Sequence, residues 1–476
     1  MQKKVSSRTQ KNHERLNVIF ENCFDVVMRR LKSANGRDVL IVFSDGLCDK
    51  DLIEKSIISP LLGFAIDVDE LKIRNLSDIK ERLLSSVQIN ETDLLKDAVT
   101  ACLSGDAAVF IDGSKQALII QVRKWQSRGI SEPETQRSVR GPREGFTETL
   151  LFNVAMLRRK IRSSLMKTEI VKAGSVTKTD VCLVYIEGIA DTKLIELLKK
   201  RLKNTDAAYI LDSGHVEQLI EDKHTTLFST TCINEKPDVV AAKLIKGRVA
   251  VIVDGSPAVI TAPMLMSENF QSPEDFYSRP FYANFIRVLR YAAYFITLTL
   301  PAFYVALVTL HRSLIPDKLL SVIILASEGV PLNIALEMFL LLTVYELLRE
   351  AMLRLPSQVG SSVGLVGVLI IGEAAVGVNL IGAPTVVICA VTFIASAVVS
   401  PLNDSAVLLR FILLALGSFM GAYGVFLGLF VILVRLCSLT SYGCPYLLPI
   451  APLDIEGIKT SVLRTDIKDI LKRRNR

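Results

Sequence analysis

The chain has 476 residues, a formal net charge of +7 and a mean hydropathy of +0.38, and 50% of its residues are hydrophobic. This composition is too apolar for an ordinary soluble protein, and the modest, dispersed positive charge argues against a nucleic-acid partner. Between residues 355 and 434 the only charged side chains are Glu373, Asp404 and Arg410, whereas most of the charge lies before Tyr291. The sequence therefore predicts a soluble region followed by a membrane region.

The N-terminal segment MQKKVSSRTQKNHER has no apolar core after its charged residues, so we expect no cleavable signal peptide. We interpret residues 1–34 as a basic flexible tail. The eight cysteines form no CxxC pair and no metal-binding spacing with the four histidines. Scattered cysteines are typical of structural thiols in a reducing compartment, so we expect the large N-terminal part to be cytoplasmic.

An internal repeat follows this tail. The segment DVLIVFSDGLCDKDLIEK begins at Asp38, and DVCLVYIEGIADTKLIEL begins at Asp180, with eight of eighteen positions identical. GDAAVFIDGS from Gly105 matches GRVAVIVDGS from Gly247 at six of ten positions, and both offsets are 142 residues. Two separate matches at one offset predict two homologous subdomains, which we place at residues 35–128 and 169–284.

Each subdomain is expected to be an α/β layer structure. Short runs rich in valine and isoleucine predict buried strands, and they lie at 39–43, 107–111, 181–185 and 249–253. Asp-Gly-Ser follows the second strand of each copy and is either a catalytic turn or a strand-ending turn in which glycine adopts positive φ. The second interpretation is favoured. We find no enzyme signature, so we expect no enzymatic activity, cofactor or metal site.

The stretch SEPETQRSVRGPREGFTETLLFNVAMLRRK, residues 131–160, lies between the copies, and we assign residues 129–168 to a signature loop and a linking helix. Apolar residues from Thr147 to Lys167 have helical spacing, and Thr147 is the expected helix cap. Basic side chains would cluster near this helix: Arg140, Arg143, Arg158, Arg159, Lys160 and Arg162. They form either an anion site or a solvated or acid-paired hinge between the subdomains, and the hinge is favoured.

The membrane region is placed at residues 285–440, with four to six membrane segments. Residues 291–310 have no charge and are long enough to span, and Pro331 in EGVP predicts a break between a short interfacial helix and a span from about Leu332. Further segments are expected near 359–381, at 383–400, which either spans or dips and returns, and at 406–435, which spans. Residues 441–476 form a basic cytoplasmic tail, which requires an even number of crossings.

The segment near 359–381 is rich in small residues, which allow helices to approach closely, so we expect it inside a bundle or an assembly. The candidate pore and packing residues are Gly360, Val363, Gly364, Val366, Gly367, Ile370 and Glu373. An intramembrane carboxylate such as Glu373 is a candidate functional group. It either lines an ion path or is protonated and bonded to a neighbouring helix. Glu328 and Glu337 are weaker candidates that lie nearer an interface.

Two motifs resemble the A subunits of GerA-type spore germinant receptors. They are PETQRSVRGPREGFTETLLFNVAMLRRKIR and REAMLRLPSQVGSSVGLVGVLIIGEAAV, and the resemblance covers nearly the whole chain. The family pattern tends to have Glu where this chain has Gln136, and Gln where it has Glu373. The resemblance assigns a signature joint with a signalling role to Pro133, Arg140, Gly141, Pro142, Arg143, Glu144, Gly145, Phe146, Asn153 and Arg158.

The resemblance implies a multi-pass subunit in the spore inner membrane, with its N-terminal domain in the spore core. It implies a transporter-like B subunit and a lipoprotein C subunit as partners. It also implies self-association, expected as a pentamer, into a nutrient-gated cation channel that initiates germination. The alternative is a sensory or scaffold subunit whose α/β region binds a ligand or a partner. A secondary transporter is less favoured, since we see no repeat among the spans.

Overall fold

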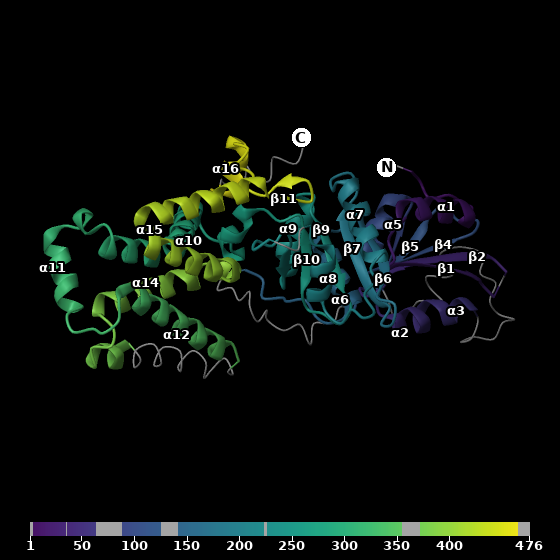
Figure 1. Ribbon diagram of the computed structural model, residues 1–476. Coiled ribbons are helices and arrows are strands. Elements are labelled where there is room, and N and C mark those ends of the chain that lie inside the picture. Colours follow the sequence, from purple (N-terminus) through teal and green to yellow (C-terminus); the bar gives the residue numbers. More distant parts are fainter. Residues whose placement is uncertain are drawn as a thin grey trace. The chain divides into compact units, whose positions relative to one another are not determined.

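The computed structural model describes residues 3–34, 36–62, 88–124, 141–222, 226–354 and 372–464. The chain forms two compact units. The N-terminal unit comprises residues 1–224 and 230–264. The C-terminal unit comprises residues 225–229 and 265–476. The described sheets of five strands belong to the first unit and the long apolar helices to the second (Figure 1).

The N-terminal unit contains two sheets with the same topology. The first consists of β1 (Val26–Lys32), β2 (Asp38–Ser44), β3 (Ile89–Thr92), β4 (Ala107–Ile111) and β5 (Ala117–Ile120), in the order β1-β2-β4-β5-β3. The second consists of β6 (Met166–Ala173), β7 (Thr179–Ile186), β8 (Cys232–Asn234), β9 (Val249–Val253) and β10 (Val259–Ala262), in the order β6-β7-β9-β10-β8. All pairings between these strands are antiparallel. The equivalent order supports the repeat that the sequence predicts.

Helices cover both faces of the first sheet because alternate side chains of its buried strands point to opposite faces. Val39 and Ile41 pack in one apolar cluster, and Leu40 and Val42 pack in another. The helices of the unit are α1 (Thr9–Ile19), α2 (Lys50–Ile53), α3 (Ser59–Leu62), α5 (Leu95–Leu103), α6 (Leu150–Lys160), α7 (Thr192–Lys203), α8 (Ser213–Ile220) and α9 (Pro237–Ile245), and η1 (Glu54–Ile58) joins α2 to α3. The expected layered subdomains are therefore built on antiparallel sheets.

The segment that we interpreted as a basic flexible tail is part of the first subdomain. Residues 3–34 contain α1 and the edge strand β1, which pairs with β2 along its whole length. Val5, Leu16 and Phe20 are buried in the apolar cluster beneath the sheet. The prediction of a tail was wrong because these few apolar residues, spaced along a charged segment, are enough to bury one face of α1.

The C-terminal unit is built from helices. They are α10 (Pro280–Thr309), α11 (Asp317–Ala326), α12 (Ile334–Arg354), α14 (Ala383–Val398), α15 (Asn403–Ser438) and α16 (Ile455–Ser461). The short elements are η3 (Met266–Phe270), η4 (Pro273–Phe276), η5 (Arg312–Leu314), η6 (Ser400–Leu402), β11 (Thr440–Ser441) and β12 (Cys444–Pro445). The predicted break is confirmed, since Gly329 has φ of 85° between α11 and α12.

Helix α15 reverses its direction at Gly421. This glycine has φ of 63° and ψ of −147°, a conformation that only glycine adopts without strain. After the reversal, a Cβ atom added to Gly428 would lie 2.5 Å from Cδ2 of Leu413, although fifteen positions separate the two residues. The two halves of α15 therefore lie side by side (Figure 1). The segment that we expected to cross once is a helical hairpin.

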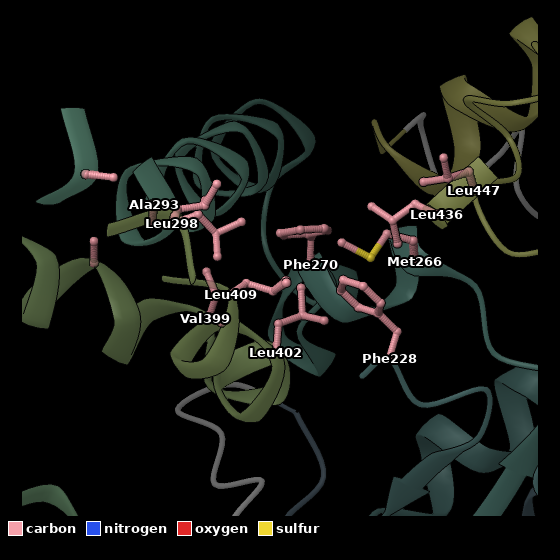
Figure 2. Packing of buried hydrophobic residues seen from close by; sticks show 14 of the residues in the cluster. Phe228, Met266, Phe270, Ala293, Leu298, Val399, Leu402, Leu409, Leu436 and Leu447 are labelled. Atoms are coloured by element: carbon pink, nitrogen blue, oxygen red, sulfur yellow. The ribbon is translucent and has the colours of Figure 1, made fainter. Parts of the chain in front are cut away.

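The beginning of α10 and the chain after α15 lie at the same end of the C-terminal unit. The side-chain amide of Asn284 donates to the carbonyl of Arg464 at 3.1 Å, and the Arg464 guanidinium donates to the carbonyl of Phe276 at 2.9 Å. An apolar cluster joins Phe270 to Leu409 and Leu436 (Figure 2). The hairpin thus returns the chain to the end of the unit at which α10 begins.

Two described helices are long and apolar enough to cross a membrane. One is Pro280–Thr309, and the other is Ser400–Ser438, which includes the hairpin. Ala383–Val398 is a shorter apolar helix. The prediction of four to six membrane segments is therefore not established by these helices alone.

Candidate functional site

The RGPREGF motif leads into α6 along the surface of the N-terminal unit. Pro133 and Arg140 lie outside the described residues, and Gly141 has φ of 115°. Pro142 is half-buried, Arg143 is exposed, and Gly145 and Phe146 are buried. The amide of Phe146 donates to the carbonyl of Glu235 at 2.8 Å. The end of the motif is therefore anchored to the second subdomain.

The first turn of α6 differs from the predicted one. The helix begins at Leu150, and Thr147 precedes it instead of capping it. Asn153, which is buried, accepts from the Thr147 amide at 2.8 Å through its side-chain oxygen. Its side-chain amide donates in return to the Thr147 carbonyl. The side chain of Asn153 therefore fixes the backbone of Thr147, which lies before the first residue of the helix.

Each Asp-Gly-Ser turn caps the helix at the start of its own repeat. The Asp254 carboxylate accepts from the first amide of α6, on Leu150, at 3.0 Å. The Asp112 carboxylate accepts from the first amide of α1, on Thr9, also at 3.0 Å. Gly113 and Gly255 have φ of 90° and 88°. The turn interpretation is supported, and α6 is the counterpart of α1 in the second repeat.

Removal of the Asp254 cap should destabilise the N-terminal unit. We expect Asp254→Ala to cost about 1 kcal/mol, because the first amide of α6 loses its acceptor. Asp112→Ala should cost a similar amount through α1. Thermal unfolding of the purified chain measures both effects. Glu196→Ala, an exposed position of α7, is the control, and equal unfolding temperatures for all three variants would contradict this assignment.

The buried centre of the joint is an ion pair between Arg158 on α6 and Asp25 before β1. Arg158 Nε donates to Asp25 Oδ2 at 2.7 Å, and Nη2 donates to Oδ1 at 2.9 Å. Both side chains are at most 1% exposed. Thr168 Oγ1, on β6, donates to the same carboxylate at 2.6 Å, and Arg158 Nη1 donates to the Ser163 carbonyl at 3.1 Å. This cluster joins the first subdomain to the second.

The two charges of this pair stabilise one another. Burial alone would raise the pKa of Asp25, but the Arg158 charge and the hydrogen bonds from Arg158 and Thr168 outweigh burial, so the pKa of Asp25 lies below its ordinary value of 3.8. The charge of Asp25 in turn raises the pKa of Arg158 against the effect of burial. Both groups are therefore ionised in the folded chain, which makes the pair dependent on its bidentate geometry.

The other basic residues at the end of α6 are paired with an acid of the signature motif. Glu144 lies 3.3 Å from Arg159 Nη2 through Oε1 and 3.3 Å from Lys160 Nζ through Oε2. These side chains are partly exposed, so each pair contributes little to stability. The acid-paired form of the predicted hinge is present at Arg158, Arg159 and Lys160.

Most of the candidate pore residues lie outside the described residues: Gly360, Val363, Gly364, Val366, Gly367 and Ile370. Glu373 is described and exposed. Arg410, which interrupted the apolar sequence, is buried and pairs with Glu346 of α12. Glu337, which we ranked below Glu373, is only 1% exposed.

Residues 14–476 match the family model described as Bacillus/Clostridium GerA spore germination protein. The chain belongs to the GerA family. This GerA-family chain is 42% identical to "Spore germination protein KA" of Bacillus subtilis (strain 168), over 92% of this chain and 81% of the relative. It is 37% identical to "Uncharacterized membrane protein YfkQ" of the same organism, over 97% of this chain and 89% of the relative.

A crystal structure is also similar to this GerA-family chain. It is the N-terminal domain of the A subunit of the Bacillus megaterium spore germinant receptor GerK3. The identity is 33%, the match covers 56% of this chain and 98% of the solved one, and the TM-score is 0.45.

Proposed function

We propose that the chain is a membrane subunit of a nutrient-sensing spore germinant receptor. The observation that carries the proposal is the match to a spore germination family over residues 14–476, together with two helices long and apolar enough to cross a membrane. The subunit acts in the spore inner membrane beside a transporter-like B subunit and a lipoprotein C subunit. Its N-terminal unit faces the spore core.

Within this function, the chain forms a homo-oligomer, a pentamer by family resemblance, that conducts cations when the nutrient binds its partner. The C-terminal unit supports the proposal through its buried charge, because Arg410 is buried and paired with Glu346. Buried charges of this kind are costly in a membrane and are retained for a purpose. The pore is formed by the segment from Gly360 to Glu373.

A deletion experiment tests the receptor role. Spores that lack this chain should fail to release monovalent cations in response to the nutrient that the receptor recognises, and expression of the wild-type chain should restore release. Cation release in response to a panel of nutrients is compared between the two strains. Germination triggered by high pressure or through a second receptor serves as the control. An unchanged response to every nutrient, in spores with no other member of the family, would contradict the proposal.

A second candidate function is ligand binding by the N-terminal unit. A cleft of about 590 Å³ lies among α1, α5 and the loop between α6 and β6. Its lining combines apolar Val18 and Val99 with four basic residues and one acidic residue, Lys3, Arg15, Lys96, Arg162 and Glu14. This volume suits a small molecule, and the charge suits an anion with an apolar body. Ser163, in the same lining, accepts from Arg158, so a ligand there would contact the joint.

A fluorinated aromatic anion tests this second function. The ¹⁹F signal of 4-(trifluoromethyl)benzoate should broaden in the presence of the full chain in nanodiscs. Val99→Trp fills the cleft and should abolish the broadening. The neutral analogue 4-(trifluoromethyl)benzamide is the control, because its broadening measures partition of the aromatic ring into the lipid. Equal broadening by Val99→Trp and the wild-type chain would remove the cleft as a binding site.

A further inference from the structure

A buried carboxylate in the C-terminal unit lies where several helices meet. Glu337, near the start of α12, accepts from the Gly382 amide at 2.8 Å and from Thr385 Oγ1 at 3.1 Å, both through Oε2. The Tyr304 hydroxyl of α10 lies 3.3 Å from Thr385 Oγ1. Oxygen atoms from α10, α12 and α14 therefore gather around this carboxylate.

The second oxygen of the carboxylate is buried without a partner. Oε1 of Glu337 has no hydrogen-bond partner among the described residues, and the side chain is 1% exposed. The two bonds to Oε2 are those of a helix cap, since Gly382 and Thr385 lie at the N-terminus of α14. Capping therefore accounts for one oxygen and leaves the other unexplained.

The negative charge at Glu337 also lacks a cationic side chain. No Lys, Arg or His of the described residues forms an ion pair with Glu337. Residues 355–371, LPSQVGSSVGLVGVLII, contain no basic residue. A buried carboxylate with no cationic side chain is costly, and the partial positive charge at the start of α14 offsets only part of that cost.

Further oxygen atoms lie close to Gly382, on the Oε2 side of the carboxylate. A Cβ atom at this position would lie 3.2 Å from Ser327 Oγ, 3.4 Å from Glu337 Oε2 and 3.5 Å from the carbonyl oxygen of Ala326. That carbonyl belongs to the last residue of α11, whose helix dipole places partial negative charge there. Ala326 is exposed.

We propose that Glu337 and its surrounding oxygens bind a monovalent alkali cation, Na⁺ or K⁺. The donor set consists of one carboxylate, the hydroxyls of Thr385, Tyr304 and Ser327, and the Ala326 carbonyl. Hard cations select such oxygens, and a single formal negative charge suits a monovalent ion better than Ca²⁺, which is bound by several carboxylates. The bound ion ties the end of α11 and the start of α14 to α12. This site deepens the proposed channel function.

Direct ion binding tests the site without any need for flux. The full chain is placed in nanodiscs in N-methyl-D-glucamine chloride, and binding of ²²Na⁺ and of ⁸⁶Rb⁺ is measured by scintillation proximity. The wild-type chain should bind at least one isotope saturably, with competition by unlabelled Na⁺ or K⁺. Glu337→Gln should weaken binding by about 100-fold or more, because the charged donor is lost.

Two further variants keep the test decisive. Gly382→Ala retains the carboxylate but crowds the oxygens of Ser327, Glu337 and Ala326, and it should weaken binding by about tenfold. Glu350→Gln, at an exposed carboxylate of the same helix as Glu337, should bind as the wild type does. If Glu337→Gln does not fold, Gly382→Ala decides. No saturable binding by the folded wild-type chain, or unchanged binding in Gly382→Ala and Glu337→Gln, overturns the site, whatever the outcome for conduction.

Discussion

Replacement of Arg158 with methionine should destabilise the N-terminal unit by about 3–5 kcal/mol, because it leaves the buried charge of Asp25 without its partner. Asp25 is 1% exposed and accepts two hydrogen bonds from the guanidinium. Methionine fills part of the volume but donates no hydrogen bond. The joint between the subdomains should loosen, and the receptor that contains this variant should not signal.

Unfolding of this variant can be followed with a maleimide dye. Cys23, Cys48, Cys102 and Cys182 are buried thiols of the N-terminal unit, and burial raises the pKa of Cys48 to about 12. They should react only when the unit opens, whereas the exposed Cys437 reacts at once. Arg162→Met, at an exposed position near by, is the matched control. If both variants open at the same temperature, the pair is not the centre of the joint.

The same pair gives the unit a defined response to acid. The pKa of Asp25 is lower in the folded chain than its ordinary value of 3.8, so the unfolded state takes up a proton first as the pH falls. The pair contributes its full stability when the pH is above the pKa of Asp25 in the unfolded chain. This contribution is lost as the pH falls from there through the lower pKa of Asp25 in the folded chain. The wild-type chain should therefore lose stability in this acid range by more than Arg158→Met does.

The second large effect is expected from Gly424→Ala in the helical hairpin. An added Cβ atom would lie 2.3 Å from the Leu416 carbonyl oxygen and 2.8 Å from Met420 Cβ. A backbone oxygen cannot move aside without separation of the two halves of α15, so we expect a cost of about 3 kcal/mol. The measurement is the unfolding temperature of the purified chain, together with its level in the membrane.

Gly377→Ala is the matched control, because no heavy atom of the described residues lies within 4 Å of the added Cβ. The hairpin also predicts the side on which two thiols react. Asn403→Cys and the native Cys437 stand at the two ends of α15, so a membrane-impermeant maleimide should label both from the same side. Labelling from opposite sides would show a single crossing and would contradict the reversal at Gly421.

The sequence predicted the parts of the fold that depend on short patterns. The strands at 107–111 and 249–253 coincide with β4 and β9, since runs of valine, isoleucine and alanine fill the buried centre of a sheet. Positive φ at Gly113 and Gly255 followed from the Asp-Gly-Ser turns. Such features are local, so their signals lie within a few neighbouring residues.

The centre of the joint could not be predicted in the same way. Arg158 was singled out within a basic cluster, but its partner Asp25 is 133 positions away and lies in a segment that we interpreted as a tail. Likewise, the hairpin is hidden in one continuous apolar run, because Gly421 is one of several glycines there and only its φ distinguishes it. Glu337 was ranked below Glu373 because a sequence does not indicate which carboxylate is buried.

Cation flux through the reconstituted complex tests the proposed function most directly. The chain and its proposed B and C subunits are placed together in liposomes loaded with K⁺, and efflux is recorded as nutrient is added. The account predicts nutrient-dependent efflux that requires this chain and that is lost with Arg158→Met. A complete complex that binds the nutrient but releases no K⁺ would contradict it.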